Sequence, residues 1–257
     1  RMEELQPDVQ CDYIACGHVV PERIAGIVSG IAEACVAAGA ALLGGETAEH
    51  PGLMGPDDFD MAGATVGVVE ADEMIGAERV RPGDVVVAMA SSGLHSNGYS
   101  LVRRVLLDEA GLSLEASIPE LGRTVGEELL EPTRVYALDA LALIHGVQVH
   151  AMSHITGGGL ANNLARVLPG TVTAHLDRGA WTPPAIFALV QRLGQVSQRD
   201  IEATLNMGVG MAAVVAPDDA DAAVQLLADR GVDAWICGEM VASSAEDPRV
   251  ELAGQHR

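Results

Sequence analysis

The chain has 257 residues, of which 49% are hydrophobic, 20% charged and 3% aromatic, a composition typical of a folded globular protein. Its 36 acidic residues outnumber the 15 basic ones, all arginine, and the formal net charge of −21 argues against nucleic acid or an anionic membrane as a partner. No apolar run approaches the roughly 20 residues of a membrane span, and the polar, acidic start does not resemble a signal peptide, so we expect a cytoplasmic protein.

The four cysteines are Cys11, Cys16, Cys35 and Cys237. They form no C-x-x-C pair and no spacing typical of a zinc site. We therefore expect reduced thiols without a functional role, as is usual in a cytosolic protein.

The first third of the chain predicts one helix and two strands. Pro21 can begin the helix without losing a hydrogen bond, and Gly39 suits its end. The other predicted segments are an irregular start (1–11), strands (41–43 and 64–70) and an acidic loop (57–60). The turn-rich stretch 71–82 predicts a boundary near residue 79, and hence domains over residues 1–78 and 79–257.

The rest of the chain alternates strands and helices. Apolar runs predict strands over residues 85–90, 147–152, 171–176, 209–215 and 234–241. Predicted helices occupy residues 101–110, 132–144, 160–167, 183–192 and 219–229, with a loop region over 112–122 and a polar tail over 243–257. This alternation predicts an α/β or α+β fold with helices packed on a mixed sheet.

One loop joins the strand 85–90 to the helix after it, in the segment Ser91-Ser92-Gly93-Leu94-His95-Ser96-Asn97-Gly98-Tyr99-Ser100-Leu101-Val102-Arg103. A helix N-terminus carries free N–H groups and a partial positive charge, which suit a phosphate. His95 and Ser96 would add side-chain donors, and Asn97 or Ser100 would cap the helix. An ordinary polar turn explains the same residues, and spacing alone favours neither interpretation.

A second segment, Gly44-Gly45-Glu46-Thr47-Ala48-Glu49-His50, gathers two carboxylates, a hydroxyl and an imidazole after a short strand. Glycine lets the backbone approach a ligand, and carboxylates are the usual ligands of Mg²⁺ held with a nucleotide. The residues alone slightly favour the alternative, a turn with solvated acids.

Two further motifs flank predicted strands. Thr156-Gly157-Gly158-Gly159 favours an anion cradle of backbone N–H groups over a flexible linker. His154 would serve as a general acid or base, although a histidine at a strand end more often satisfies a backbone group. Asn206 would either contact a ligand or cap a turn, and these two interpretations are equally supported.

Together these segments resemble the phosphoribosylformylglycinamidine cyclo-ligase family, the aminoimidazole ribonucleotide synthetases of purine biosynthesis. The resemblance rests on residues 91–103, on 44–52, on His154-Ile155-Thr156-Gly157-Gly158-Gly159-Leu160 and on Asn206-Met207-Gly208-Val209-Gly210-Met211. These four segments occur in the family's order. The resemblance runs from about Asp12 to Val241, which is nearly the whole chain.

The family uses ATP to phosphorylate the formyl oxygen of formylglycinamidine ribonucleotide, after which an amidine nitrogen attacks the formyl carbon and closes the imidazole ring. The resemblance implies a two-domain synthetase fold, ATP and Mg²⁺ as cofactors, and a phosphorylated small molecule as partner. With it, we expect His95, His154 and Glu46 to be catalytic, and Glu46 also to bind the metal. The expected phosphate, nucleotide or substrate contacts are Gly45, Thr47, Ser96, Asn97, Gly98, Thr156, Gly157, Gly158, Gly159 and Asn206.

Family members also carry an earlier glycine-rich loop and an Asp-Gly-Val-Gly-Thr-Lys block, and residues 1–11 do not match what should precede Asp12. We therefore expect an N-terminally shortened cyclo-ligase with an incomplete first domain. Because the family forms homodimers through strands of that domain, the sequence leaves dimerisation and activity open. The alternatives are another ATP-dependent synthetase of the superfamily, such as selenophosphate synthetase or the hydrogenase-maturation dehydratase, and an inactive ligand-binding fragment.

Overall fold

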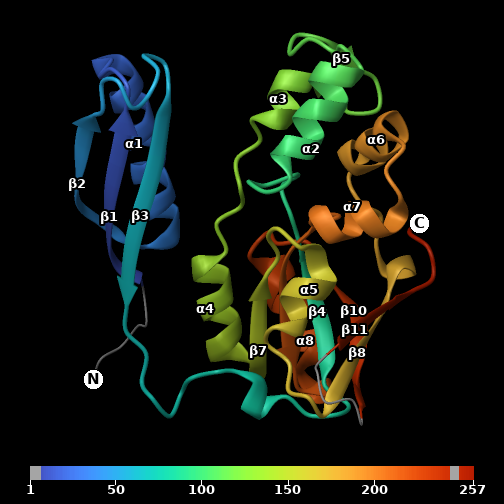
Figure 1. The fold of residues 1–257 in the computed structure, drawn as a ribbon. Coiled ribbons are helices and arrows are strands. Elements are labelled where there is room, and N and C mark those ends of the chain that lie inside the picture. The colour runs from blue at the N-terminus through green and yellow to red at the C-terminus, as the bar shows by residue number, and fades with distance from the viewer. Residues whose placement is uncertain (1–6, 244–248) are drawn as a thin grey trace. The chain divides into compact units, whose positions relative to one another are not determined.

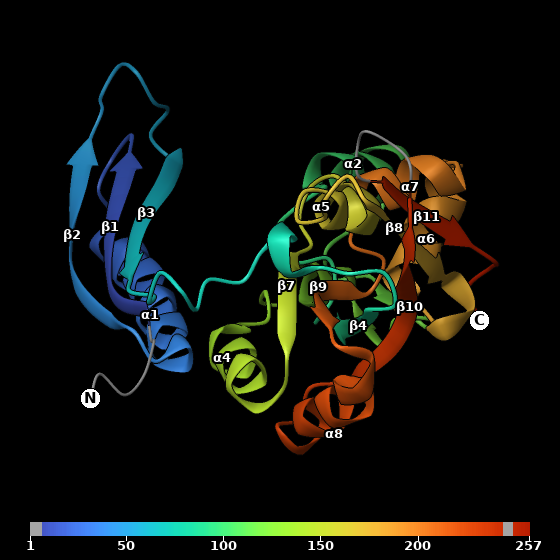
Figure 2. The same ribbon diagram turned by 90° about the horizontal axis from the view of Figure 1, so that it is seen from below.

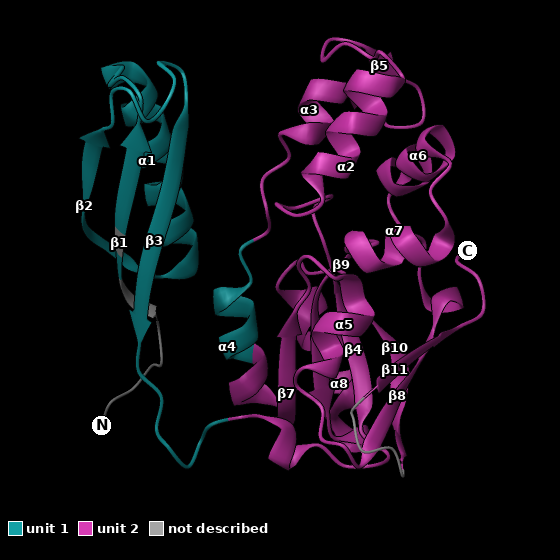
Figure 3. Ribbon diagram, viewed as in Figure 1, with its two compact units in different colours: residues 1–74, 135–142 teal, residues 75–134, 143–257 magenta. Residues whose placement is uncertain are grey.

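The computed structural model describes residues 7–243 and 249–257 (Figure 1). The chain divides into two compact units, which we describe separately (Figure 3). Unit 1 comprises residues 1–74 and 135–142, and unit 2 comprises residues 75–134 and 143–257. The compact units thus divide at residue 74, a few residues before the predicted boundary near residue 79, and part of a later helix joins unit 1.

Unit 1 contains a mixed three-stranded sheet in the order β2-β1-β3. Its strands are β1 (Pro7–Cys16), β2 (Ala41–Glu49) and β3 (Phe59–Gly67). Strand β1 pairs in parallel with β2 and antiparallel with β3. Helix α1 (Pro21–Ala38) makes the crossover that the parallel pair requires. The helix prediction is confirmed, because proline stands in its first turn and Gly39 ends it with a left-handed φ of 72°.

Three predictions for unit 1 are wrong, and strand pairing explains each. Residues 7–11 belong to strand β1 and are not irregular, whereas residues 1–6 lie outside the described part of the chain. The Gly44–Glu49 segment continues strand β2 instead of forming a loop, since it pairs with β1 from Cys11 to Cys16. Strand β3 begins at Phe59, inside the predicted acidic loop, because Phe59 pairs with Cys16.

Unit 2 is built on a mixed six-stranded sheet in the order β11-β8-β10-β4-β9-β7. Its strands are β4 (Val85–Ala90), β7 (Val149–His154), β8 (Val172–Asp177), β9 (Val209–Val215), β10 (Ala234–Ala242) and β11 (Arg249–Ala253). Neighbouring strands are antiparallel except for β11 and β8. All five predicted strands are present. The predicted polar tail is wrong over 249–253, because this segment pairs with β8 at the edge of the sheet; residues 244–248 lie outside the described residues.

Seven α-helices of the described chain follow strand β4. They are α2 (Tyr99–Arg103, continued by the π-helical η2, Arg104–Glu109), α3 (Val125–Leu129), α4 (Ala137–Gly146), α5 (Gly159–Ala165), α6 (Ala185–Gly194), α7 (Gln198–Thr204) and α8 (Ala220–Asp229). The helix predicted from residue 132 begins only at Ala137. Helices α3 and α7 were not predicted, although Thr124 and Glu127 form a capping box before α3 and Ser197 caps α7.

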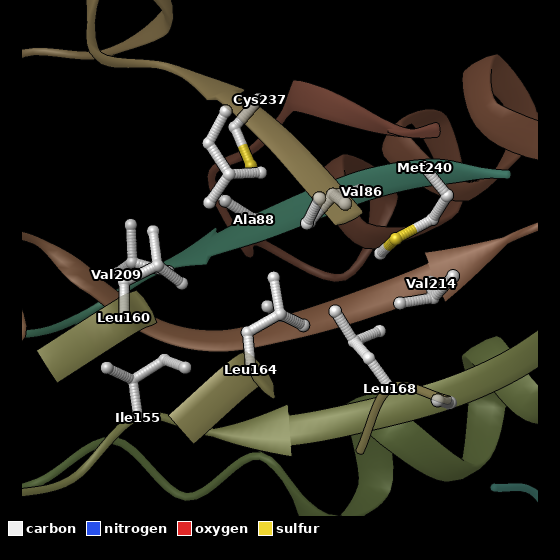
Figure 4. Close-up of a cluster of buried hydrophobic side chains, with 14 of the residues drawn as sticks. Val86, Ala88, Ile155, Leu160, Leu164, Leu168, Val209, Val214, Cys237 and Met240 are labelled. Atoms are coloured by element: carbon white, nitrogen blue, oxygen red, sulfur yellow. The ribbon is translucent and has the colours of Figure 1, made fainter. Parts of the chain in front are cut away.

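Helices α5 and α8 cover opposite faces of this sheet (Figure 2). Leu160 and Leu164 of α5 pack on residues that alternate along the central strands, such as Val86, Ala88 and Val214 (Figure 4). A second apolar cluster joins α2, η2, α6 and α7 beyond the end of strand β4 (Figure 1). The loops at this end of the sheet are therefore held between two packed cores. The predicted fold of helices on mixed sheets is confirmed.

Candidate functional site

Three of the predicted loops meet at one end of the strands β4, β9 and β7 in the unit 2 sheet. Strand β9 lies between β4 and β7 and is antiparallel to both, so the ends of β4 and β7 lie beside the start of β9. Ala90 pairs with Val209, and His154 pairs with Met211. The loops 91–98, 154–159 and 206–208 therefore adjoin. A Cβ atom added to Gly157 would lie 3.3 Å from Oδ1 of Asn97, which shows how closely the first two loops approach.

Asn206 connects the first loop to the third. Its buried side-chain Nδ2 donates to the carbonyl oxygens of Gly93 and Leu94 at 2.9 and 3.2 Å. Its Oδ1 accepts from the backbone N–H of Gly208 at 2.8 Å and from the hydroxyl of Ser91 at 3.1 Å. These four contacts use the hydrogen-bonding capacity of the amide. Ligand contact by Asn206 stays a prediction, and its observed contacts are those of a residue that holds the loop.

His95 is buried in the first loop with a left-handed φ of 61°. The backbone N–H of Ser92 donates to its Nε2 at 3.1 Å, so the neutral ring carries its proton on Nδ1. Burial, and secondarily the charge of His154, lowers the pKa of His95 from 6.5 to about 4. His95 is therefore uncharged near neutral pH. In contrast to this buried ring, His154 is exposed at the end of β7.

Close packing requires one glycine in each of the first two loops. Gly159 has a φ of 68°, and a Cβ atom there would lie 1.7 Å from the carbonyl oxygen of Glu202 in α7. Gly98 of the first loop, with a φ of 80°, similarly faces the side chain of Leu205 at 2.3 Å. These two glycines bring the loops against α7 and the residue that follows it, whatever ligand they contact.

Asn163 in helix α5 shapes the second loop and was missed by the sequence analysis. Its buried Nδ2 donates to the carbonyl oxygens of Thr156, Gly157 and Gly159 at 3.3, 3.3 and 2.8 Å. Its Oδ1 accepts from the Thr156 hydroxyl at 3.2 Å. Asparagine is unfavourable inside a helix because it competes for backbone hydrogen bonds. An asparagine one turn after three glycines was the signal that could have found it.

The segment Pro132-Thr133, to which the sequence analysis assigned no physical role, lies against the first loop. The Ser92 hydroxyl donates to the carbonyl oxygen of Pro132 at 2.6 Å. The hydroxyls of Ser96 and Thr133 are 2.9 Å apart. Ser96 is exposed and Thr133 is half-buried, so both hydroxyls are near solvent.

The remaining predicted residues lie on strand β2 of unit 1. Glu46 lies across from Tyr13 of β1 and shares its face of the sheet, whereas Thr47 projects to the opposite face because side chains alternate along a strand. An open cavity of about 460 Å³ is lined by Asp12, Tyr13, Gly44, Gly45, Glu46, Ala62, Gly63 and Ala64. Asp12 was not among the predicted site residues. The small residues of this cavity leave the Glu46 carboxylate accessible.

The described residues contain no group of three or more His, Cys, Asp or Glu side chains placed to hold a metal ion. A cage made of protein ligands alone is therefore not present among them. Mg²⁺ is commonly held by one or two carboxylates together with substrate phosphates. Glu46, exposed beside the unit 1 cavity, fits that second arrangement.

Two family models match the chain. Residues 81–251 match the AIR synthase related protein, C-terminal domain, and residues 6–69 match the N-terminal domain of the same name. The chain belongs to this family. The prediction made from the four motifs is confirmed.

Named relatives place the chain among the family's cyclo-ligases, which are enzymes of purine biosynthesis. It is 67% identical over 161 residues to a Streptomyces fradiae protein provisionally named phosphoribosylformylglycinamidine cyclo-ligase, covering 63% of this chain and 88% of that protein. It is 47% identical over 229 residues to the Shouchella clausii phosphoribosylformylglycinamidine cyclo-ligase, covering 89% of this chain. The chain spans 66% of the length of that second relative.

Solved structures share the fold at low sequence identity. Thiamine-monophosphate kinase from Stenotrophomonas maltophilia K279a has a TM-score of 0.70 and 18% identity, with 98% of this chain and 74% of that chain covered. The hydrogenase maturation protein HypE in complex with ATP has a TM-score of 0.65 and 19% identity, with coverage of 98% and 72%. At such identity these similarities establish the fold alone. Across residues 7–243 and 249–257, no helix is long and apolar enough to cross a membrane.

Proposed function

We propose that this chain closes the imidazole ring of aminoimidazole ribonucleotide from formylglycinamidine ribonucleotide, with ATP converted to ADP and phosphate. The observation that carries the proposal is the meeting of the loops 91–98, 154–159 and 206–208 at one end of the strands β4, β9 and β7. The cytoplasm as the place of reaction, ATP and Mg²⁺ as cofactors, and a phosphorylated small molecule as partner all belong to this proposal.

In the proposed site, the first two loops bind a phosphoryl group. The side chains of Ser96 and Asn97 offer neutral donors, and the backbone of 156–159 offers N–H groups close to them. The donors within these loops are neutral, because residues 91–98, 154–159 and 206–208 contain no arginine or lysine. Asn206 and Asn163 hold the loops that carry these donors in place, because their side chains donate hydrogen bonds to loop carbonyl oxygens.

The two histidines have different roles in the proposed reaction. His154 is exposed at the end of β7, and we propose it as the general acid or base. His95 stays neutral because its pKa is lowered to about 4, and it keeps the first loop in shape through the N–H of Ser92. A charged imidazolium at position 95 is therefore not part of the proposed reaction near neutral pH.

Glu46 is proposed to hold Mg²⁺ together with the phosphates of ATP, and the bound metal would neutralise the charge that develops during phosphoryl transfer. The exposed carboxylate beside small residues supports this role. Gly45 permits the close approach of β2 to β1 at this point, since a Cβ atom there would lie 2.7 Å from the carbonyl oxygen of Asp12. Thr47, on the opposite face of the sheet, is proposed as a separate ligand contact.

The test is the release of phosphate from Mg-ATP by the purified chain, with and without formylglycinamidine ribonucleotide. The proposal predicts release that depends on the ribonucleotide and is matched by an imidazole product. Glu46→Gln should lower this release at least tenfold, with Glu49→Gln as the control, because Glu49 instead contacts His18 at 3.0 Å. Phosphate release that is the same with and without the ribonucleotide, or that is not accompanied by an imidazole product, would contradict the proposal.

A further inference from the structure

The segment after helix α3 contributes a second hydroxyl beside the first loop. Ser96 Oγ and Thr133 Oγ1 are 2.9 Å apart, and either hydroxyl is able to donate in this geometry. The two residues are 37 positions apart in the sequence. Their contact therefore depends on how the segment 131–134 is placed against the loop.

This placement is fixed on both sides of Thr133. The preceding residue, Pro132, accepts a hydrogen bond from the Ser92 hydroxyl at 2.6 Å and has a restricted φ. Before it, Glu131 pairs with the guanidinium of Arg123 at 2.5 Å. After it, Arg134 donates to the carbonyl oxygen of Gly231 at 3.2 Å. The Thr133 hydroxyl is thus held near Ser96 by contacts that its own side chain does not make.

The direction of the hydrogen bond decides what Ser96 can bind. A hydroxyl has one proton to donate and two lone pairs that accept. If Ser96 donates to Thr133, its proton is used and the oxygen repels an anion. If Thr133 donates to Ser96, the Ser96 proton is available, and the incoming hydrogen bond polarises it further. An anion accepts hydrogen bonds only, so its contact with Ser96 requires the second direction.

We propose that Thr133 is a positioning residue that orients the Ser96 hydroxyl toward the phosphoryl group of the ribonucleotide. This inference rests on the proposed function, in which Ser96 donates to a phosphoryl group, and it specifies that group as the phosphate of the ribonucleotide. Thr133 does not touch the ligand. It acts by donating a hydrogen bond from its hydroxyl to the Ser96 oxygen.

The experiment measures dissociation constants of the full chain for formylglycinamidine ribonucleotide and for the matching ribonucleoside, which lacks the phosphate. Thr133→Val, which keeps the branched shape without the donor, should weaken ribonucleotide binding about fivefold. Ribonucleoside binding should not change. Thr133→Ser, which keeps the donor, should bind both ligands like the wild type. In Ser96→Ala, adding Thr133→Val should cause no further loss, because the two hydroxyls act as one unit.

The outcomes separate this inference from the function on which it rests. If Ser96→Ala weakens ribonucleotide binding and Thr133→Val does not, the role of Thr133 is overturned and the proposed function stands. If Thr133→Val weakens both ligands equally and also lowers the thermal unfolding midpoint, the residue is structural and the inference is overturned. If the wild type does not prefer the ribonucleotide, or Ser96→Ala changes nothing, the phosphate contact of Ser96 and the role of Thr133 both fail, whereas ring closure is judged separately by phosphate release and the imidazole product.

Discussion

The backbone N–H of Ser92 donates to Nε2 of His95 at 3.1 Å, and this bond fixes the protonation of a buried ring. Protonating Nε2 would break the bond and place a charge in a buried position, which agrees with a pKa lowered to about 4. A residue expected to be catalytic from its motif is thus kept neutral mainly by burial, in the tautomer that the Ser92 contact fixes. This relationship makes a prediction about stability and pH.

His95 should make the folded state less stable at acidic pH. Its folded pKa lies below its unfolded value of 6.5, so between about pH 6.5 and pH 4 the unfolded chain binds more protons than the native one. Stability should therefore fall as pH falls through this window, by up to about 3 kcal/mol from this residue. Urea unfolding of the wild type and His95→Gln at pH 7.5 and pH 4.5 would measure the effect. An equal loss of stability in both proteins would show that His95 is not responsible.

Asn163→Ala should destabilise unit 2 by about 2–3 kcal/mol, because it leaves loop carbonyl oxygens without their buried donor. The matched control is Asn162→Ala. Asn162 is the neighbouring residue and donates only one bond, to the carbonyl oxygen of Gly158 at 2.8 Å near solvent, so its loss should cost under about 1 kcal/mol. Chemical unfolding measures both values. Similar losses in the two variants would refute the special role of Asn163.

Gly159→Ala should cost more than a left-handed φ alone explains. A Cβ atom at Gly159 would lie 1.7 Å from the carbonyl oxygen of Glu202, whereas Gly231 has a similar φ of 74° with nothing within 4 Å. Gly231→Ala therefore measures the backbone cost, about 1–2 kcal/mol. Gly159→Ala should add at least about 2 kcal/mol through the forced shift of α7. Thermal unfolding of the two variants compares them, and equal midpoints would mean that the loop does not pack on α7 as described.

The bounds of strands β4 and β9 were predicted to the residue. Both are short apolar runs that lie inside the sheet and are covered on both faces, so their hydrophobic residues are continuous and end where the strands end. Strand β2 was predicted too short, because Gly44 and Glu46 are poor strand formers that pair only through the neighbouring β1. Strand β11 was missed for a similar reason: Arg249 and Glu251 alternate with apolar residues in a polar stretch, and pairing with β8 decides the outcome.

The sequence predicted the motifs of the candidate site one by one, but it did not predict that their loops lie next to one another. Each glycine-containing loop follows or precedes a buried strand, which the sequence shows, but their meeting depends on the order β4-β9-β7. That order is a property of the whole sheet and has no local signal. For the same reason the supporting contacts of Asn163 and Thr133 were missed, since each contact depends on how a helix or segment is placed against a loop.

The most direct test of the central claim, that two loops of unit 2 form one phosphate site, is a titration of the isotope-labelled chain with formylglycinamidine ribonucleotide followed by amide NMR shifts. We predict that the amides of residues 91–98 and 156–159 shift together along one saturation curve, and that the ribonucleoside without phosphate produces much smaller shifts. Shifts confined to one loop, or equal shifts with the ribonucleoside, would contradict the claim.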